Sequence, residues 1–465
     1  MNSLRIRLND RKRFLGAAVV AAVWVLLVGG TDALAATNTV WCVPDTSISA
    51  LCTAGKGKPH ISDAATSGLN PDLAEGDVIL VGPGYYHESV YVDTTNVYIF
   101  GAQAGNDARV GRNDLWKESV VDASLGAYGN GGGAAFYLET DNEVVDGFTI
   151  EGGTSGAYGS GIYEEDDTGV QILNNIIQNN AVGVYLYEGT SNLVEYNLFK
   201  TNNTPQAGPS IDFVAGMSGF GIAGEFGPYS YFGTSITENA FQGNKAAAVW
   251  LWEATGTEIT KNTSEKDGSF FVCVACESTS FDHNRGQDFA PQQGFKIPLT
   301  SSPGPADAAV DLLYYAYGMQ INDNVLEGGK TATYNGIAFS TIAGIDDVYD
   351  TVCDYCQVSN NTICDFKGNG IVAELPPDGN ATLEYSQVSK NDVENNGGDG
   401  ILIEGNYSTN NGYNALFENK AKDNRGLDCK DNTYGSFTLG TYDTWFNNSG
   451  NMSSPLTLCS RAFWH

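Results

Sequence analysis

A short pattern that repeats along most of this chain constrains its fold more than any other feature. An aliphatic residue is followed three positions later by Asn and five positions later by an apolar residue, as in Ile172, Asn175 and Ile177. The repeated asparagines are Asn175, Asn197, Asn239, Asn262, Asn284, Asn324, Asn361, Asn391 and Asn419. Repeats with a period of roughly 20–50 residues are typical of solenoids, in which each repeat forms one coil.

The spacing of these asparagines predicts how the coils are divided along the chain. Successive spacings are 22, 42, 23, 22, 40, 37, 30 and 28 residues. We interpret 42 as two coils, and 37 and 40 as single coils that carry loops. The pattern is interrupted at 203–218, 286–310 and 341–356. Insertions within solenoid repeats emerge as loops, often on the binding face.

Each repeat predicts short strands rather than helices. Apolar residues alternate, as at Val184 and Leu186, whereas the repeats contain no long apolar pattern of helical period. An Asn between two strands suits a left-handed bend, which Asn tolerates better than most residues. If the coils stack about 4.8 Å apart, the Asn amides can form a hydrogen-bonded ladder. The sequence therefore predicts an all-β solenoid.

The repeat VQILNNIIQNNAVGVYLYEGT, residues 170–190, resembles those of the right-handed parallel β-helix proteins of the pectate-lyase-like superfamily. The resemblance covers about residues 76–430 and implies a single-stranded right-handed parallel β-helix of about a dozen coils with caps at both ends. GDVILVGPGYYHESV, residues 76–90, is similar to the opening coil of many such proteins, including pectin methylesterases. No later segment resembles the catalytic segments of the esterases. The superfamily contains lyases, hydrolases, esterases, epimerases and non-enzymatic surface proteins, so the resemblance implies no particular reaction.

The chain is expected to divide into four parts. Residues 1–35 are predicted to be a signal peptide, with a basic start, the apolar run Phe14–Val28 and small residues at Ala33-Leu34-Ala35. An uncleaved anchor is the alternative, and Sec and twin-arginine export both remain open. Residues 36–75 form an N-terminal cap, 76–430 the β-helix and 431–465 a C-terminal cap. A secreted or cell-surface protein, monomeric and not inserted in a membrane after cleavage, is expected.

The strongly acidic balance excludes some partners. The formal net charge is −31, which repels nucleic acid and anionic membranes. Aromatic residues make up 11% of the chain, and apolar periodicity is strong, so a folded core is expected rather than disorder. The charge either keeps an elongated exported protein soluble or attracts cations.

The chain has nine cysteines, and an exported protein meets an oxidising compartment in which disulfides are the default. Disulfides are predicted between Cys42 and Cys52 and between Cys429 and Cys459. For the other five, the sequence leaves disulfides or buried thiols, a zinc site and a redox centre open. They are Cys273, Cys276, Cys353, Cys356 and Cys364.

The most informative candidate site is a Glu that recurs just after one strand of each coil. Stacked like charges are unfavourable, so a column of them suggests a bound cation or carboxyls held for acid–base chemistry. The candidate catalytic residues are Glu188, Glu253 and Glu277. Neighbouring coils would place carboxylates about 5 Å apart, close to a retaining glycosidase pair, and two coils would place them about 9.6 Å apart, close to the limit for an inverting pair. The alternative is that each Glu is a solvated turn residue.

Strand alternation places a set of aromatic residues on the outer face beside these carboxylates. They are Tyr163, Tyr185, Tyr187, Trp250 and Trp252. Exposed aromatic rings flanked by carboxylates suit a sugar chain, and we expect these residues to bind substrate. The alternative is that long loops cover them.

Two further candidates concern metal and base. Glu164, Glu165, Asp166 and Asp167 form the best candidate cation site, since Ca²⁺ takes several oxygen ligands. The same run is equally well explained as a charged turn. A lyase would need a base, for which Lys261 or Arg285 is a candidate.

We therefore predict a protein that binds an extracellular polysaccharide along the aromatic and Glu-bearing face, either with or without cleaving it. As an enzyme it would be a hydrolase or a lyase. The alternative is a non-catalytic surface or structural β-helix.

Overall fold

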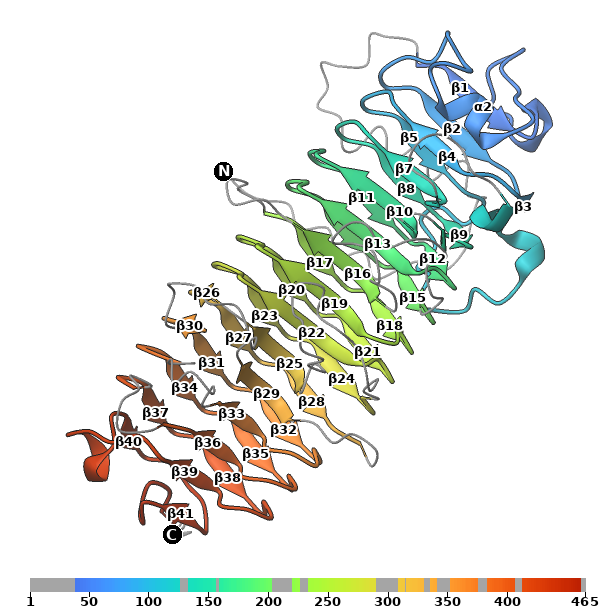
Figure 1. The fold of residues 1–465 in the computed structure, drawn as a ribbon. Helices are drawn as coiled ribbons and strands as arrows, with labels where there is room; N and C mark the ends of the chain where they lie inside the picture. The colour runs from blue at the N-terminus through green and yellow to red at the C-terminus, as the bar shows by residue number, and fades with distance from the viewer. Residues whose placement is uncertain are drawn as a thin grey trace, which may run out of the picture.

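The computed structural model describes residues 38–125, 133–155, 159–202, 220–225, 233–289, 308–313, 315–329, 335–340, 352–374, 383–405 and 412–460. These residues form a right-handed parallel β-helix, which is a rod of stacked coils (Figure 1). The fold predicted from the sequence is confirmed. The predicted signal peptide lies outside the described residues. Within the described ranges, no helix is long and apolar enough to cross a membrane.

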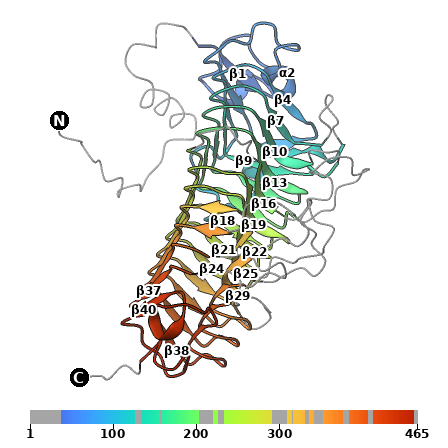
Figure 2. The same cartoon turned by 60° about the vertical axis from the view of Figure 1, so that its left-hand side comes forward.

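Most coils contribute one strand to each of three parallel sheets, which we name A, B and C. Sheet A has 14 strands, sheet B 12 and sheet C 13. Figure 2 shows the strands of each sheet stacked along the axis of the rod.

Sheet A consists of β1 (Val40–Val43), β2 (Val78–Val81), β5 (Tyr98–Phe100), β8 (Val144–Asp146), β11 (Gln171–Leu173), β14 (Leu193–Glu195), β17 (Ser235–Thr237), β20 (Glu258–Thr260), β23 (Ser280–Asp282), β27 (Gln320–Asn322), β31 (Gln357–Ser359), β34 (Gln387–Ser389), β37 (Ala415–Phe417) and β40 (Thr444–Phe446). Sheet B consists of β3 (Gly84–Tyr86), β6 (Ser119–Asp122), β9 (Phe148–Glu151), β12 (Ile176–Gln178), β15 (Leu198–Lys200), β18 (Ala240–Gln242), β21 (Thr263–Glu265), β24 (Arg285–Gln287), β28 (Val325–Glu327), β32 (Thr362–Cys364), β35 (Asp392–Glu394) and β38 (Lys420–Lys422).

Sheet C consists of β4 (Val90–Val92), β7 (Phe136–Leu138), β10 (Ser160–Glu165), β13 (Val182–Tyr187), β16 (Phe220–Glu225), β19 (Ala247–Trp252), β22 (Ser269–Val274), β25 (Ala308–Leu313), β29 (Asn335–Ser340), β33 (Ile371–Ala373), β36 (Ile401–Ile403), β39 (Cys429–Asp431) and β41 (Ser453–Ser454). A short pair, β26 (Ala316–Tyr317) and β30 (Cys353–Asp354), joins two coils between sheets C and A. The helical turns are η1 (Thr46–Ile48), α2 (Ile61–Ala65), η2 (Leu115–Lys117), η3 (Ala123–Leu125) and η4 (Thr438–Gly440).

The core is a file of apolar side chains inside the coils. Residues in register on successive strands stack on one another, as Ile162, Val184 and Ile222 do in sheet C. All three are fully buried. Because side chains alternate along a strand, every second residue points into this core and the others point outward.

The predicted asparagine ladder lies at the turn between sheets A and B, which we call the A–B corner. Asn361 shows the arrangement. Its side-chain oxygen accepts hydrogen bonds from the backbone N–H and the amide of Asn324, and its own amide donates to Asn391 and to the carbonyl of Ile321. Backbone N–H to side-chain Oδ1 bonds link all nine predicted asparagines and continue to Asn448, a tenth member.

The ladder also corrects the predicted division into coils. The N–H of Asn197 donates to Oδ1 of Asn239 at 3.0 Å, so the spacing of 42 residues is one coil with insertions, not two. The spacings of 40 and 37 are single coils, as predicted, because Asn284, Asn324 and Asn361 are bonded in succession. An insertion changes the sequence spacing without breaking the ladder.

Disulfides are found at both ends of the rod and within two of its coils. The predicted bonds Cys42–Cys52 and Cys429–Cys459 are present. Two more join Cys273 to Cys276 and Cys353 to Cys356, while Cys364 is free. The disulfide alternative therefore holds for both C-x-x-C pairs, and neither pair is part of a zinc site.

Candidate functional site

Sheet C differs from the other two sheets in strand length and in its insertions. From β10 to β29 its strands have six residues, whereas most strands of sheets A and B have three. The connections into and out of the sheet C strands differ in length from coil to coil. The A–B turns are two residues long from β11 to β38. Variation in this chain is therefore concentrated at sheet C, which is where insertions in a solenoid build a binding face.

The outer face of sheet C also differs in composition from the outer faces of sheets A and B. The central coils of sheets A and B present polar residues such as Thr237, Thr260 and Gln242. Sheet C instead carries a layer of apolar side chains on its outer face. Its buried residues include Tyr163, Val182, Tyr185, Ala247, Trp250, Trp252, Val272, Val274 and Leu313. We call this set the outer aromatic layer.

The predicted substrate-binding residues point outward, as strand alternation required, but most of them are not exposed. Tyr163 and Tyr185 are 1% exposed, Trp250 is 0% and Trp252 is 9%, while Tyr187 is half-buried. The prediction of an exposed aromatic surface is therefore wrong for four of the five residues. They pack on one another, with ring centroids 5.4 Å apart for Tyr163–Tyr185 and 6.1 Å for Trp250–Trp252.

A file of tyrosines extends this layer toward the N-terminal end. Tyr91, Tyr137, Tyr163 and Tyr185 lie on successive coils, with centroid separations of 5.2, 5.0 and 5.4 Å. The hydroxyls of Tyr91 and Tyr137 donate to the carboxylates of Glu139 and Glu165. Rings and carboxylates thus lie together on this face, although Tyr91 was not among the predicted residues.

The three predicted catalytic carboxylates do not form one file. Glu188 and Glu253 directly follow strands β13 and β19, in left-handed backbone conformation with φ of 56° and 54°. The coil of β16 separates them. Glu277 lies three residues beyond the end of β22 and is bridged to Thr255 and Tyr317. These carboxylates do not pair on neighbouring coils, because the strand-to-Glu offset differs between coils. Glu188 and Glu253 instead hold the same position two coils apart, which is the second of the two spacings expected from the sequence.

The side chains of the four residues predicted to bind a cation point in different directions. Glu164 is in register with the inward-pointing Leu138 and Leu186 and is fully buried. Glu165 points outward and accepts from Tyr137, and Asp166 is an exposed turn residue with φ of 62°. Across the described ranges, no group of three or more acidic, His or Cys side chains is arranged to hold a metal. The prediction of one cation site formed by Glu164, Glu165, Asp166 and Asp167 is wrong.

Instead, Glu164 belongs to a group of buried carboxyls. The N–H of Asp167 donates to Glu164 Oε1 at 2.8 Å, and Glu143 accepts from the backbone of Thr140 at 3.0 Å. Burial raises the pKa of Glu143 to about 8, that of Asp167 to about 7 and that of Glu164 well above its usual range. One oxygen of each carboxyl has no hydrogen-bond partner among the described residues. Protonated carboxyls suit such a site better than charged ones.

Sequence reasoning missed one acidic residue in the middle of the outer aromatic layer. Asp311 lies on β25, in register with Val272 and Ala338, and its side chain points outward. It is 1% exposed. Burying a carboxylate is costly unless it is paired or hydrogen-bonded, so such a residue is a functional candidate. The signal in the sequence was a lone Asp within the apolar run Ala308–Leu313.

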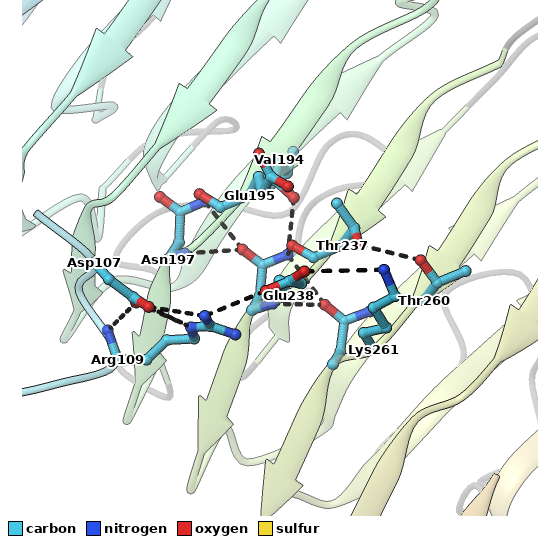
Figure 3. Close-up of polar contacts among 11 residues, drawn as sticks. Asp107, Arg109, Val194, Glu195, Asn197, Thr237, Glu238, Thr260 and Lys261 are labelled. Carbon is cyan, nitrogen blue, oxygen red and sulfur yellow. Dashed lines mark hydrogen bonds and ion pairs between the residues drawn. The ribbon is translucent and has the colours of Figure 1, made fainter. Parts of the chain in front are cut away.

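The candidate bases of a lyase lie away from this face. Lys261 is on the A–B corner, 3.9 Å from Glu238, and Arg285 begins strand β24 of sheet B. Figure 3 shows Lys261 and Glu238 beside Arg109, whose guanidinium lies 2.8 Å from Asp107 and 3.4 Å from Glu238. Arg109 belongs to residues 101–118, which cross several coils, since Arg112 also donates to the carbonyl of Asn174. Arg109 and Lys261 thus pair with acidic residues at the A–B corner, and neither Lys261 nor Arg285 lies on sheet C.

Comparisons with known proteins find one family model and several solved structures that are similar to this chain. The family described as periplasmic copper-binding protein (NosD) matches residues 86–216. No curated protein sequence is significantly similar to this chain. Similar solved structures include the catalytic unit of a GH87 α-1,3-glucanase from Streptomyces thermodiastaticus strain HF3-3, with 14% identity, a TM-score of 0.48 and coverage of 82% of this chain and 64% of that one.

A DFA-IIIase from Arthrobacter chlorophenolicus A6 without its lid has 15% identity and a TM-score of 0.45, covering 82% of this chain and 94% of its own. An alginate lyase from Paenibacillus sp. str. FPU-7 has 15% identity and a TM-score of 0.37, covering 77% and 94%. At identities of 15% or less and TM-scores below 0.5, these likenesses carry no argument about the activity of this chain.

Proposed function

We propose that this chain is an exported β-helix protein that binds an extracellular polysaccharide at the outer face of sheet C. The observation that carries the proposal is the surface of the outer aromatic layer, where the half-buried rings of Tyr137 and Tyr187 pack against the buried residues. Insertions border this face, and Glu188 and Glu253 follow its strands. Aromatic rings pack on the C–H faces of sugars, and carboxylates accept hydrogen bonds from hydroxyls. Four disulfides support export, because such bonds persist in oxidising compartments.

Binding is tested by electrophoresis of the full chain through gels that contain single polysaccharides, with and without EDTA. We expect retardation by at least one polysaccharide, and Tyr187→Ala should weaken it by roughly tenfold, as for a central contact residue. Tyr187 is half-buried, so this change disturbs the fold less than truncation of Trp250. Thr237→Ala, on the outer face of sheet A, is the matched control and should leave binding unchanged. Unaltered binding by Tyr187→Ala, Trp250→Ala and Trp252→Ala together would refute the proposal.

The proposal extends from binding to cleavage of the polysaccharide at this face. Asp311 and Glu253 are the acidic candidates on or beside the outer aromatic layer, and Glu188 and Glu277 are tested with them. If the retarding polysaccharide is depolymerised, we expect Asp311→Asn or Glu253→Gln to lower the rate at least a hundredfold, as for loss of a general acid or base. Loss of turnover in EDTA would indicate that the reaction depends on a divalent cation.

A non-catalytic scaffold remains the second candidate function. It is favoured by the failure of Glu188, Glu253 and Glu277 to pair on neighbouring coils. A scaffold would bind polysaccharide, or another surface, without producing new reducing ends. Reducing-end assays on the retarded polysaccharide therefore separate the two functions.

A further inference from the structure

A second aromatic file lies on the C-terminal half of the rod, at the turn between sheets C and A, which we call the C–A corner. Tyr317, Tyr355, Tyr385 and Tyr413 lie on four successive coils, with ring centroids 5.5, 5.5 and 5.1 Å apart. Unlike the outer aromatic layer, these rings are exposed, by 40%, 56%, 48% and 48%. In Figure 1 their coils run from β26 and β30 past β34 to β37 along one edge of the rod.

The backbone at three of these tyrosines is unusual for so large a residue. Tyr355, Tyr385 and Tyr413 have φ of 56°, 47° and 59°, in the left-handed region. In earlier coils the same turn position, one residue after the bridged residue, holds glycine or serine. These are Gly169, Ser191, Gly256, Ser278 and Gly318. Large residues also adopt this conformation at the A–B corner, as Tyr196 does with φ of 59°. The change from glycine or serine to tyrosine at one turn position is therefore what distinguishes these coils.

Polar side chains border the tyrosines on both sides. Glu277, Asp354 and Glu384 occupy the bridged positions on one side, which form a continuous column through Tyr317. On the other side, Gln320, Gln357 and Gln387 are in register on sheet A. Acceptors and amides thus line a row of rings that repeats once per coil. We call this arrangement the tyrosine stripe.

We propose that the tyrosine stripe binds an extended, uncharged polysaccharide chain that runs parallel to the axis of the rod. The coil repeat of about 4.8 Å is close to the advance of an extended glycan per sugar unit, so each coil can offer the same contacts to successive sugars. The carboxylates and amides accept from and donate to hydroxyl groups. The three acidic residues, on a chain of net charge −31, repel a polyuronate. This inference rests on the proposed function and adds a substrate class and a second surface to it.

The test compares three sets of variants in gels that contain soluble β-1,3/1,4-glucan, pullulan or alginate. Tyr355→Gly/Tyr385→Gly/Tyr413→Gly restores the residue that suits the turn. It should weaken binding of a neutral glucan by roughly tenfold or more without lowering the melting temperature. Gln357→Ala/Gln387→Ala leaves rings and backbone in place and should weaken it by about threefold or more. Phe446→Ser, in the stacked pair Phe417–Phe446 on sheet A, is the control and should bind as the wild type does.

The outcomes separate this inference from the proposed function. Wild-type affinity in both stripe variants, with loss of binding in Tyr187→Ala, overturns the stripe and leaves the proposed function standing. No retardation of the wild type by any polysaccharide overturns both. Retardation by alginate alone, lost in the stripe variants, overturns the uncharged substrate class. A lower melting temperature in the glycine variant with full affinity assigns the tyrosines to stability and overturns the inference.

Discussion

The A–B corner and the C–A corner of the same coils are built on opposite principles. At the A–B corner ten asparagines form one uninterrupted ladder, and the turn keeps the same length from β11 to β38. At the C–A corner the equivalent positions change from coil to coil. The residue directly before a sheet A strand, for example, is Asn192, Thr257, Met319, Cys356 or Asn414 in different coils.

This difference shows where the chain is free to vary. A buried amide that links two neighbouring coils cannot be replaced without leaving buried groups unsatisfied on both sides. A corner that is partly solvated and differently bonded in each coil accepts insertions, disulfides and exposed rings. The A–B corner therefore holds the stack together, and the C–A corner and sheet C carry the features from which we infer binding.

The largest loss of stability is expected from a substitution in the asparagine ladder of the A–B corner. Asn361→Ala should remove the acceptor of Asn324 and the donor to the carbonyl of Ile321, which lie 2.9 Å and 2.8 Å away. Each buried group left unpaired costs about 1–3 kcal/mol, so we expect a loss of ~3 kcal/mol or more in the free energy of unfolding. Chemical denaturation measures it.

The neighbouring residue supplies a matched control. Asn360 is exposed and has φ of 58°, a conformation that glycine adopts freely. Asn360→Gly should change the free energy of unfolding by less than about 1 kcal/mol. Equal destabilisation by Asn361→Ala and Asn360→Gly would show that stability depends on the turn as a whole and not on the hydrogen bonds of the ladder.

The ladder was predictable from the sequence because its chemistry is local. Each Asn follows a strand of fixed length and bonds to the same position one coil away, so a periodic pattern in the sequence maps directly onto contacts. The burial of Trp250 and Tyr185 was not predictable in this way. Alternation determines that a side chain points outward, but segments far away in sequence decide whether the outer face is covered.

The same reasoning explains the other errors. Glu188 and Glu277 look equivalent in sequence, but they occupy different positions in the turn because the coils of β13 and β22 end differently. Glu164 looks like the start of an acidic turn, yet it is the last inward residue of β10. An offset of one residue reverses the face of a strand, and repeat patterns do not resolve such an offset where turn lengths vary.

A smaller, pH-dependent effect on stability is expected at a second ladder, in which an Asp takes the place of an Asn. At the turn between sheets B and C, Asn202 bonds to Asn244, and Asn244 in turn donates to Asp267 Oδ1 at 2.7 Å. Burial raises the pKa of Asp267 to about 7. A carboxyl whose pKa is raised in the folded state holds its proton while the unfolded chain loses it. Stability is therefore fully present below the unfolded pKa of about 4 and falls as the pH rises toward 7.

We expect the melting temperature to fall between pH 5 and pH 8, with Glu143 contributing in the same direction since burial raises its pKa to about 8. Asp267→Asn replaces the acid with the amide found in the preceding coils and should flatten this dependence. The difference between wild type and variant should be larger at pH 8 than at pH 5. A parallel shift of both profiles would show that Asp267 does not titrate in this range.

The smallest effect sharpens the comparison at the C–A corner. Tyr385→Gly removes the cost of the left-handed conformation, roughly 1–2 kcal/mol for a non-glycine residue. It also removes stacking with Tyr355 and Tyr413, and each such pair is worth about 0.5–1.5 kcal/mol. The two contributions nearly cancel, so the free energy of unfolding should change by less than about 1 kcal/mol. A loss as large as that expected for Asn361→Ala would mean that the exposed rings stabilise the rod as the buried amides do. In that case the two corners would share a structural role.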